Sequence, residues 1–532
     1  MLNIRGVKPG ESPPSGSVPP ASVASLTRRA ATSTVKSLFR ARVRQHPDAL
    51  ALEGSRGTLS YAALCDRVDR LAGVLAARGL GHGSRIAVLS ENRPEYLEVF
   101  LAAATLGAVV ACQNWRLSTP ELRSCLELAE PHLAFVSPRF ERAFADAGPS
   151  APVVLFDSPY EAALAGTEPL ADDPAIDGED AFLMLYTSGT TGLPKAAVIS
   201  HRAEIFRNLV LRAEFGIAAT DTFVAWSPLY HMGGVDYSLS TLMSGGKVIV
   251  HDGFDAERLR ELVEREPIGW LLLMPGMVAS FADVLEKHAS RPKGIKLCGV
   301  MADLVPPAQI ARITRLLGAP YANTFGATET GNPPGSASPI PVGHVPTSLS
   351  KQPSAFCELR LVDSEDRDVA EGSPGELCVR GPTLFSGYFR ADQANRHDFR
   401  GGWFHLGDVF VRRPDGTLDF VDRVKYLIKS GGENVYPAEI ERVLFHDPRV
   451  AEAAVVRRND AKWGEVPVAF VAPRDDTLTK EELFSRCRVE LAGYKQPKDI
   501  LFIGYDEFPR SASGKVLRHE LEKRLAPGPP RS

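Results

Sequence analysis

The stretch "LMLYTSGTTGLPKAAVISH", from Leu183 to His201, decides how this chain is interpreted. Glycines, hydroxyl residues and a proline interrupt it between apolar flanks, so it cannot be one continuous helix or strand. Consecutive small residues can turn their backbone N–H groups and hydroxyls to one side and form a concave anion site. Lys195 adds a point charge that suits phosphate oxygens. Because a plain surface turn is as common for such a loop taken alone, other segments must decide between the two interpretations.

The two best-known nucleotide-binding loops do not fit this stretch. The Walker motif has glycine before its lysine and Ser or Thr after it, but Pro194 and Ala196 stand at those positions. A dinucleotide-binding GxGxxG loop also fails, because Gly189 and Gly192 are three residues apart. A phosphate site here would therefore belong to another class of loop.

The composition is that of a globular protein with more than one domain. The 532 residues exceed what one hydrophobic core usually serves, and 44% of them are hydrophobic and 24% charged. The net charge is −4 and no long basic run occurs, so we expect no nucleic-acid partner. No apolar stretch approaches the roughly 20 residues that a spanning helix needs, so we also expect no transmembrane segment.

The cysteines and the first residues bear on location. Seven cysteines are scattered without a CxxC pair or zinc-like spacing, which favours a reducing compartment and a cytoplasmic protein. Residues 1–34 are rich in Pro, Ser, Gly and Ala, which predicts a disordered leader. Because basic residues follow with few acids, mitochondrial targeting by this leader is the alternative.

Apolar periodicity predicts an α/β fold. Ser60 can cap a helix that closes at Gly79, "RIAVLS" at residues 85–90 is a buried strand, and another helix follows Pro94. Similar short apolar runs recur further on, which predicts largely parallel sheets covered by helices. After about Val362 the strands are punctuated by glycines without long helices between them, as in a β-rich subdomain.

The same pattern divides the chain into parts. We expect a large N-terminal domain over residues 35–422, made of parallel-rich sheets covered by helices plus the β-rich subdomain. A hinge at residues 423–425 would join it to a small, mobile α+β C-terminal domain over residues 426–532.

The segment "YTSGTTGLPK" resembles the phosphate loop of the adenylate-forming, AMP-binding superfamily, in its acyl-CoA synthetase or CoA ligase branch. The resemblance extends from about Val35 to Leu521. It implies that the loop holds the β- and γ-phosphates of ATP. The residues implied are Thr187, Ser188, Gly189, Thr190, Thr191, Gly192 and Lys195.

Two downstream segments extend the resemblance to the rest of the nucleotide. "NTFGATETG" resembles the YGxTE segment, which implies Phe325 beside adenine, Thr328 near the α-phosphate and Glu329 as the anchor of Mg²⁺. Gly326 belongs to the same segment. "GGWFHLGDV" resembles the TGD segment, whose aspartate, here Asp408, accepts hydrogen bonds from the ribose hydroxyls.

Two further segments resemble the mobile parts of the superfamily. "DRVKYLIKSGGENVYPAEIE" implies Arg423 as a second ribose partner and Lys425 as the hinge residue. It also implies that Gly431 lines the channel for the pantetheine arm of coenzyme A. "FPRSASGKVLRHEL" resembles the terminal segment that carries the catalytic lysine, here Lys515. The implied catalytic residues are Lys515, Thr328, Glu329 and His231.

The resemblance places the acid substrate beside "SPLYHMGGVDYS", "GVMADLVPP" and the segment around Gly326. His231 resembles the residue that gates this pocket, although a histidine that starts a helix and bonds backbone is an equally weighted alternative. Val300 and Met301 would reshape the cavity and disfavour a straight long-chain tunnel, which favours a hydrophobic aliphatic, alicyclic or aryl acid. The implied substrate-binding residues are His231, Val235, Asp236, Gly299, Val300, Met301, Gly326 and Ala327.

Together these segments predict an ATP- and Mg²⁺-dependent ligase that joins a hydrophobic carboxylic acid to coenzyme A through an acyl-adenylate. One alternative is a stand-alone adenylating enzyme that loads the phosphopantetheine arm of a carrier protein. Another is a nucleotide-binding regulator without turnover. The sequence leaves the oligomeric state open, with a homodimer among the options.

Overall fold

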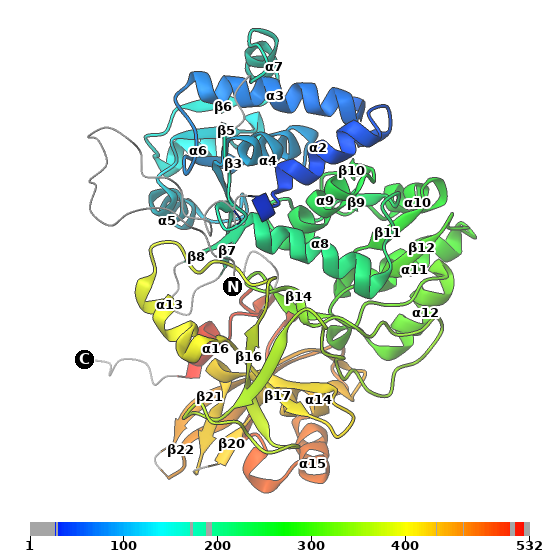
Figure 1. Ribbon diagram of the computed structural model, residues 1–532. Coiled ribbons are helices and arrows are strands. Elements are labelled where there is room, and N and C mark those ends of the chain that lie inside the picture. The colour runs from blue at the N-terminus through cyan, green and yellow to red at the C-terminus, as the bar shows by residue number, and fades with distance from the viewer. Residues whose placement is uncertain are drawn as a thin grey trace, which may run out of the picture.

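The computed structural model describes residue 27 and residues 30–170, 174–187, 194–431, 433–460, 462–510 and 516–525. Figure 1 shows a large upper part, coloured blue to yellow-green, above a smaller orange and red part. None of the helices within the described ranges is both long enough and apolar enough to cross a bilayer.

The first sheet of the large part has six strands in the order β6-β5-β3-β4-β7-β8. Every neighbouring pair is parallel except β7 and β8, which are antiparallel. The predicted parallel-rich sheet is therefore confirmed. The strands are β3 (Arg85–Leu89), β4 (Val109–Cys112), β5 (Leu133–Val136), β6 (Val153–Leu155), β7 (Ala181–Thr187) and β8 (Lys195–Ser200).

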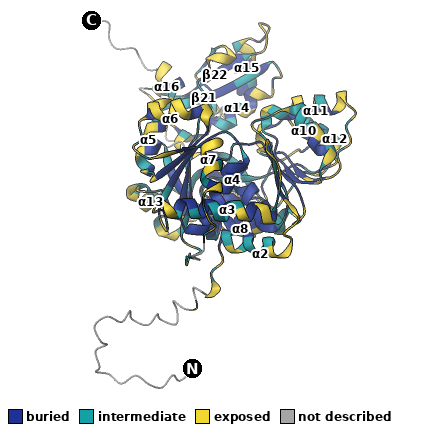
Figure 2. Cartoon of the chain, turned by 90° about the horizontal axis from the view of Figure 1, so that it is seen from above, coloured by how far each residue is buried: buried dark blue, intermediate teal, exposed yellow. Residues whose placement is uncertain are grey.

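Local signals set the ends of the helices around this sheet. Helix α3 (Tyr61–Ala77) begins where the Ser60 hydroxyl accepts a hydrogen bond from the Ala63 N–H at 3.2 Å. Helix α4 (Pro94–Leu106) is buried along its whole length and appears dark blue in Figure 2. The other helices of this lobe are α2 (Val35–Gln45), α5 (Thr119–Ala129), α6 (Glu141–Ala147) and α7 (Ser158–Ala165).

A second α/β lobe lies beside the first. It has a four-stranded sheet in the order β2-β1-β10-β9 and a parallel pair, β11 and β12. Its strands are β1 (Leu50–Gly54), β2 (Gly57–Ser60), β9 (Phe223–Ala225), β10 (Val248–Val250), β11 (Ile268–Leu271) and β12 (Ile295–Cys298). Its helices are α8 (His201–Phe215), α9 (Met232–Ser244), α10 (Ala256–Arg265), α11 (Val278–Lys287) and α12 (Pro307–Leu317).

The chain after these lobes is rich in β-structure, as the sequence predicts. An antiparallel pair, β13 (Phe325–Ala327) and β14 (Gly331–Gly335), precedes an antiparallel sheet in the order β15-β16-β17-β18. A short helix, α13 (Asp392–Asp398), lies between β16 and β17 in the chain. The four strands are β15 (Glu358–Val362), β16 (Pro374–Arg380), β17 (Phe404–Arg412) and β18 (Leu418–Arg423).

The small C-terminal part has its own sheet, in the order β20-β19-β22-β21, with β23 paired to β22. Its buried apolar residues form clusters separate from the main core, which runs from Val35 to Leu418. The strands are β19 (Ile428–Ser430), β20 (Glu433–Val435), β21 (Val450–Asp460), β22 (Gly464–Pro473) and β23 (Asp499–Phe502). The helices are α14 (Pro437–Phe445), α15 (Lys480–Glu490) and α16 (Arg518–Leu525).

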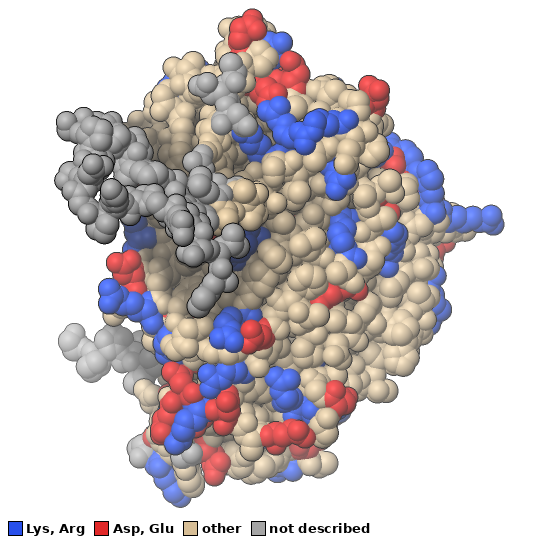
Figure 3. All heavy atoms as spheres, in the orientation of Figure 1, with Lys and Arg blue, Asp and Glu red and all other residues tan. Residues whose placement is uncertain are grey.

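Charged side chains of both signs are interspersed on the face shown in Figure 3, most densely over the lower, C-terminal part. This distribution fits the near-balanced total of 61 basic and 65 acidic residues.

Candidate active site

Two residues predicted to belong to the phosphate loop, Thr187 and Lys195, end β7 and begin β8. Thr187 and Lys195 are paired residues on these antiparallel strands. Ser188, Gly189, Thr190, Thr191 and Gly192 lie outside the described residues, so their predicted roles stay predictions.

Lys195 lies close to the predicted metal anchor, and Tyr388 joins the two. The ammonium Nζ of Lys195 is 4.7 Å from the centroid of the Tyr388 ring and 3.8 Å from Asp398 Oδ2. The hydroxyl of Tyr388 donates a hydrogen bond of 2.8 Å to Glu329 Oε1. Burial, and then the Glu329 carboxylate, raise the pKa of Tyr388, so this hydroxyl remains a donor. The structure thus brings two sequence-predicted residues together through a third.

The surroundings of Glu329 fit a magnesium ion. Its carboxylate is half-buried, and Tyr388 occupies one of the two oxygens. No group of three or more His, Cys, Asp or Glu side chains that could hold a metal occurs in the described part of the chain. A single carboxylate is what Mg²⁺ needs when nucleotide phosphates and water supply its other ligands.

The residues predicted to bind the nucleoside lie on neighbouring strands or pack against them. Asp408 on β17 is paired directly with Arg423 on β18, with Asp408 Oδ1 3.2 Å from Arg423 Nε. The ring of Phe325 lies 4.7 Å from that of Phe410 and 5.5 Å from that of Phe420, measured between centroids. Phe325 therefore packs on the same two strands that carry the ribose candidates.

His231 is the N-cap of α9, and its Nδ1 accepts a hydrogen bond of 3.3 Å from the Gly233 N–H. The helix-start interpretation of this histidine thus describes one of its contacts, while its gating role stays a prediction. Val235 on α9 is fully buried. Asp236 is buried as well, and its Oδ2 accepts a hydrogen bond of 3.0 Å from Nη1 of Arg207. Its contact with substrate stays a prediction.

The segment at Gly299 follows β12 and packs closely against Tyr321. Gly299 has φ +73°, and a Cβ there would lie 2.1 Å from the ring of Tyr321, so only glycine fits. The Tyr321 hydroxyl donates to the Val300 carbonyl at 3.0 Å. Met301, with φ +50°, has 37% of its surface exposed, and Val300 is partly buried. Gly326 and Ala327 lie on β13.

Asp303, two residues beyond Met301, pairs with a buried lysine. The ammonium of Lys351 is 2.6 Å from Asp303 Oδ2, and it also donates to Asn323 Oδ1. Because the Lys351 side chain is only 1% exposed, this pair fastens the segment after β12 to the chain just before Phe325. The sequence alone left the direction of this carboxylate open.

The mobile-domain candidates lie around the link between the two parts. Lys425 is exposed in the single 3-10 turn between β18 and β19, where its carbonyl accepts from Arg457. Gly431 has φ +62°, and a Cβ there would lie 2.7 Å from the ring of Trp463. Lys515 lies outside the described residues, although Arg510 and Val516 on either side of it pair as an isolated bridge.

Sequence reasoning missed two residues of this site, Tyr388 and Arg207. Tyr388 lies in the "FSGYF" run, which carries no charge, and Arg207 looks like an ordinary helix-surface arginine. Only the juxtaposition of β8, β13 and the chain before α13 shows what they contact.

Comparison with known families and proteins identifies the family of this chain. The profile of the family described as "AMP-binding enzyme" matches residues 39–389, and that of the "AMP-binding enzyme C-terminal domain" matches residues 439–515. Among characterised relatives, indoleacetate–CoA ligase of Aromatoleum aromaticum is 35% identical, over 90% of this chain and 96% of that protein. Feruloyl-CoA synthase of an Amycolatopsis species is 34% identical, over 91% and 97%.

Solved structures of CoA synthetases and related enzymes also match this chain over most of its length. O-succinylbenzoate CoA synthetase (MenE) of Bacillus subtilis, in complex with its acyl-adenylate intermediate, matches with a TM-score of 0.80 and 28% identity over 91% of this chain and 97% of that one. ATP-bound MatB of Rhodopseudomonas palustris matches with a TM-score of 0.80 and 27% identity over 92% and 99%. This chain therefore belongs to the AMP-binding enzyme family, as one of its AMP-forming acid–thiol ligases.

Proposed function

We propose that this ligase activates an aromatic or other compact hydrophobic carboxylic acid. The reaction proceeds by adenylation with ATP and then thioester formation with coenzyme A. The observation that carries the proposal is the contact chain from Lys195 through Tyr388 to Glu329, together with the Asp408–Arg423 pair. Relatives named for indoleacetate and ferulate, together with the pinned Gly299–Met301 segment, support a compact acid over a long chain.

The proposed roles follow from where charge develops. In adenylation the substrate carboxylate attacks the α-phosphorus of ATP and pyrophosphate leaves, so preorganised positive charges and dipoles are the useful catalysts. Lys195 attracts the leaving phosphates, Thr328 lies at the α-phosphate, and Lys515 supplies a further ammonium. Glu329, oriented by Tyr388, would hold Mg²⁺, which when bound neutralises phosphate charge.

Asp408 and Arg423 bind the ribose, and Phe325 packs beside the adenine. The ion-pair separation of 3.2 Å fixes the orientation of the buried Asp408 carboxylate. An ordered acceptor loses little conformational freedom on binding, so it contributes more of its hydrogen-bond energy to affinity.

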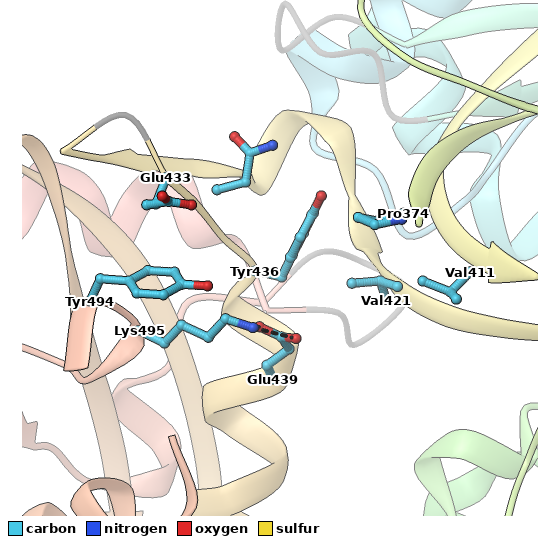
Figure 4. A pocket seen from close by; sticks show the side chains of 9 residues that line it. Pro374, Val411, Val421, Glu433, Tyr436, Glu439, Tyr494 and Lys495 are labelled. Atoms are coloured by element: carbon cyan, nitrogen blue, oxygen red, sulfur yellow. Dashed lines mark hydrogen bonds and ion pairs between the residues drawn. The ribbon is translucent and has the colours of Figure 1, made fainter. Parts of the chain in front are cut away.

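We further propose that residues 423–425 are the hinge between domains at residues 35–422 and 426–532. A cavity of about 400 Å³ lies between Pro374, Val411 and Val421 on one side and residues of the small domain, among them Tyr436 and Tyr494, on the other. Figure 4 shows Pro374, Val411 and Val421 opposite a polar wall that includes the Lys495–Glu439 ion pair. A partly polar interface with unfilled space supports a change in the orientation of the small domain.

A cytoplasmic location is proposed on chemical grounds. All seven cysteines are free thiols, and six of them are buried. Such a set suits a reducing compartment.

A panel of acids tests the proposed function. Pyrophosphate release and thioester formation are measured with benzoate, phenylacetate, indole-3-acetate, ferulate, octanoate and acetate, using coenzyme A or a phosphopantetheine-loaded carrier protein as acceptor. We expect an aromatic acid and free coenzyme A to give the highest rates. Highest rates with octanoate would overturn the substrate class, and exclusive use of the carrier protein would overturn the acceptor.

Replacing Tyr388 by Phe tests the orientation of Glu329. The substitution removes the hydroxyl that donates to Glu329 Oε1 but keeps the ring beneath Lys195. Because a hydrogen bond to a charged group contributes about 1.5–3 kcal/mol, we expect the Mg²⁺ concentration for half-maximal adenylation to rise about 10-fold or more. Tyr505→Phe, at a tyrosine that is 53% exposed, is the control. An unchanged Mg²⁺ requirement in Tyr388→Phe would refute this role.

A further inference from the structure

Arg207 on α8 is a buried arginine whose guanidinium holds three separate parts of the chain. Nη2 donates to the Thr328 carbonyl at 2.8 Å, Nη1 to Asp236 Oδ2 at 3.0 Å, and Nε to the Thr383 carbonyl at 3.3 Å. These partners lie on the nucleotide segment, on α9, and in the chain that leads to Tyr388. A planar fork with fixed donor directions can set the relative positions of three acceptors, which a flexible ammonium cannot do.

The surrounding packing leaves Arg207 little freedom. The side chains of Arg207 and Asp236 are 2% and 4% exposed, so the ion pair is shielded from water and from salt. Gly331 packs against the arginine stem, because a Cβ on it would lie 2.9 Å from Arg207 Cγ at φ +74°. The turn that follows Thr328 and Glu329 is therefore shaped around this side chain.

A second buried acid completes the cluster. Glu204, on the same helix as Arg207, is fully buried, and neither of its carboxylate oxygens has a hydrogen-bond partner among the described residues. Burial and then the nearby Asp236 raise the pKa of Glu204 well above its ordinary value. Burial also raises the pKa of Asp236, and the Arg207 guanidinium opposes that shift. When Glu204 is protonated, one positive Arg207 faces one negative Asp236 and the charges balance.

The contacts of Arg207 link the two reactants' sites. Asp236 belongs to α9, whose N-cap is His231, a residue of the expected acid pocket. Thr328 precedes Glu329, whose carbonyl accepts from the Phe385 N–H at 2.8 Å and whose side chain accepts from Tyr388. One guanidinium thus contacts both the helix beside the expected acid pocket and the segment expected to lie at the α-phosphate.

We propose that Arg207, anchored by Asp236, is a positioning residue for adenylation. Through the Thr328 carbonyl and α9 it sets the distance and direction between the bound acid and the α-phosphorus. Attack on phosphorus needs the entering and leaving oxygens roughly in line, so a small displacement of either side lowers the rate without abolishing binding. This inference rests on the proposed acid adenylation.

Arg207→Lys and Asp236→Asn test the proposal, with Arg212→Lys as the matched control. Arg212 is also on α8 and donates to the carbonyls of Ile217, Ala218 and Ser240. Within the described residues, its hydrogen bonds reach neither Thr328 nor Asp236. Adenylation is measured as acid-dependent pyrophosphate–ATP exchange, using the acid of the panel that gives the highest wild-type rate. ATP affinity by calorimetry, the melting temperature, and thioester formation from supplied acyl-adenylate complete the set.

We expect Arg207→Lys to lower kcat for exchange by about 30-fold or more, and Asp236→Asn by about 10-fold. ATP affinity and thioester formation should stay within about 3-fold of wild type in both. Arg212→Lys should lower the melting temperature to a similar extent while its exchange rate stays within about 3-fold.

Wild-type exchange in Arg207→Lys, or losses in all three variants that follow melting temperature alone, would overturn the positioning role. So would a loss expressed only in ATP affinity. If the wild-type chain itself supports no exchange with any acid, the proposed function fails instead, so the two failures can be told apart.

Discussion

Replacing Lys515 by Ala is expected to slow acid-dependent pyrophosphate–ATP exchange by about 10²- to 10³-fold. In its proposed role, Lys515 places a positive charge against the negative charge that develops on the α-phosphate and on the leaving pyrophosphate. The loss of one such contact typically slows a reaction by this factor. Thioester formation from supplied acyl-adenylate should change by less than about 3-fold, because no phosphoryl transfer remains in that half-reaction. Rapid-quench measurement of the two half-reactions separates the effects.

Lys523→Ala is the matched control for this experiment. Lys523 lies on α16, pairs with Glu520 on the same helix, and is 68% exposed. Its removal should leave both half-reactions within about 2-fold of wild type. Equal rates for Lys515→Ala and wild type in the exchange assay would contradict the assignment of Lys515. So would equal losses in both half-reactions.

Replacing Gly431 by Leu is expected to have the opposite selectivity. Gly431 has φ +62° and lies against Trp463, so a side chain there must displace the indole from the surface that the two residues share. If this surface lines the pantetheine channel, thioester formation should fall roughly 100-fold, a rate loss of about 3 kcal/mol. Adenylation should stay within about 3-fold.

A control variant must distinguish the effect of backbone strain from the effect of a blocked channel. Gly416 also has a positive φ, +84°, but nothing lies within 4 Å of the position its Cβ would take. Gly416→Leu should therefore lower stability through strain alone and leave both half-reactions nearly unchanged. Loss of thioester formation in both variants, or loss of adenylation in Gly431→Leu, would mean that Gly431 serves the turn against Trp463 and no channel.

Much of the fold could be predicted from local sequence. Ser60 caps α3 as expected, and α4 starts at Pro94, because capping and proline geometry act within a few residues. The parallel-rich sheet and the β-rich subdomain also agree with the predictions, since apolar periodicity reports which faces are buried.

The candidate site could be predicted only in part. Glu329, Asp408 and Arg423 lie in short segments with recognisable residue order, and the structure brings the last two together as a cross-strand pair. Tyr388 lies 59 residues from Glu329 and has no local feature that predicts their hydrogen bond. The direction of Asp303 was likewise open until its contact with Lys351 was known.

The sequence by itself determined the class of chemistry, because the residues proposed to contact phosphate, ribose and metal lie in short contiguous segments with a recognisable residue order. Tertiary structure alone decided how these segments are positioned relative to one another. Arg207 reaches Asp236, Thr328 and Thr383 at sequence separations of 29, 121 and 176 residues. A buried guanidinium needs such partners in a low-dielectric core, but in a sequence it cannot be distinguished from an arginine solvated at a helix surface.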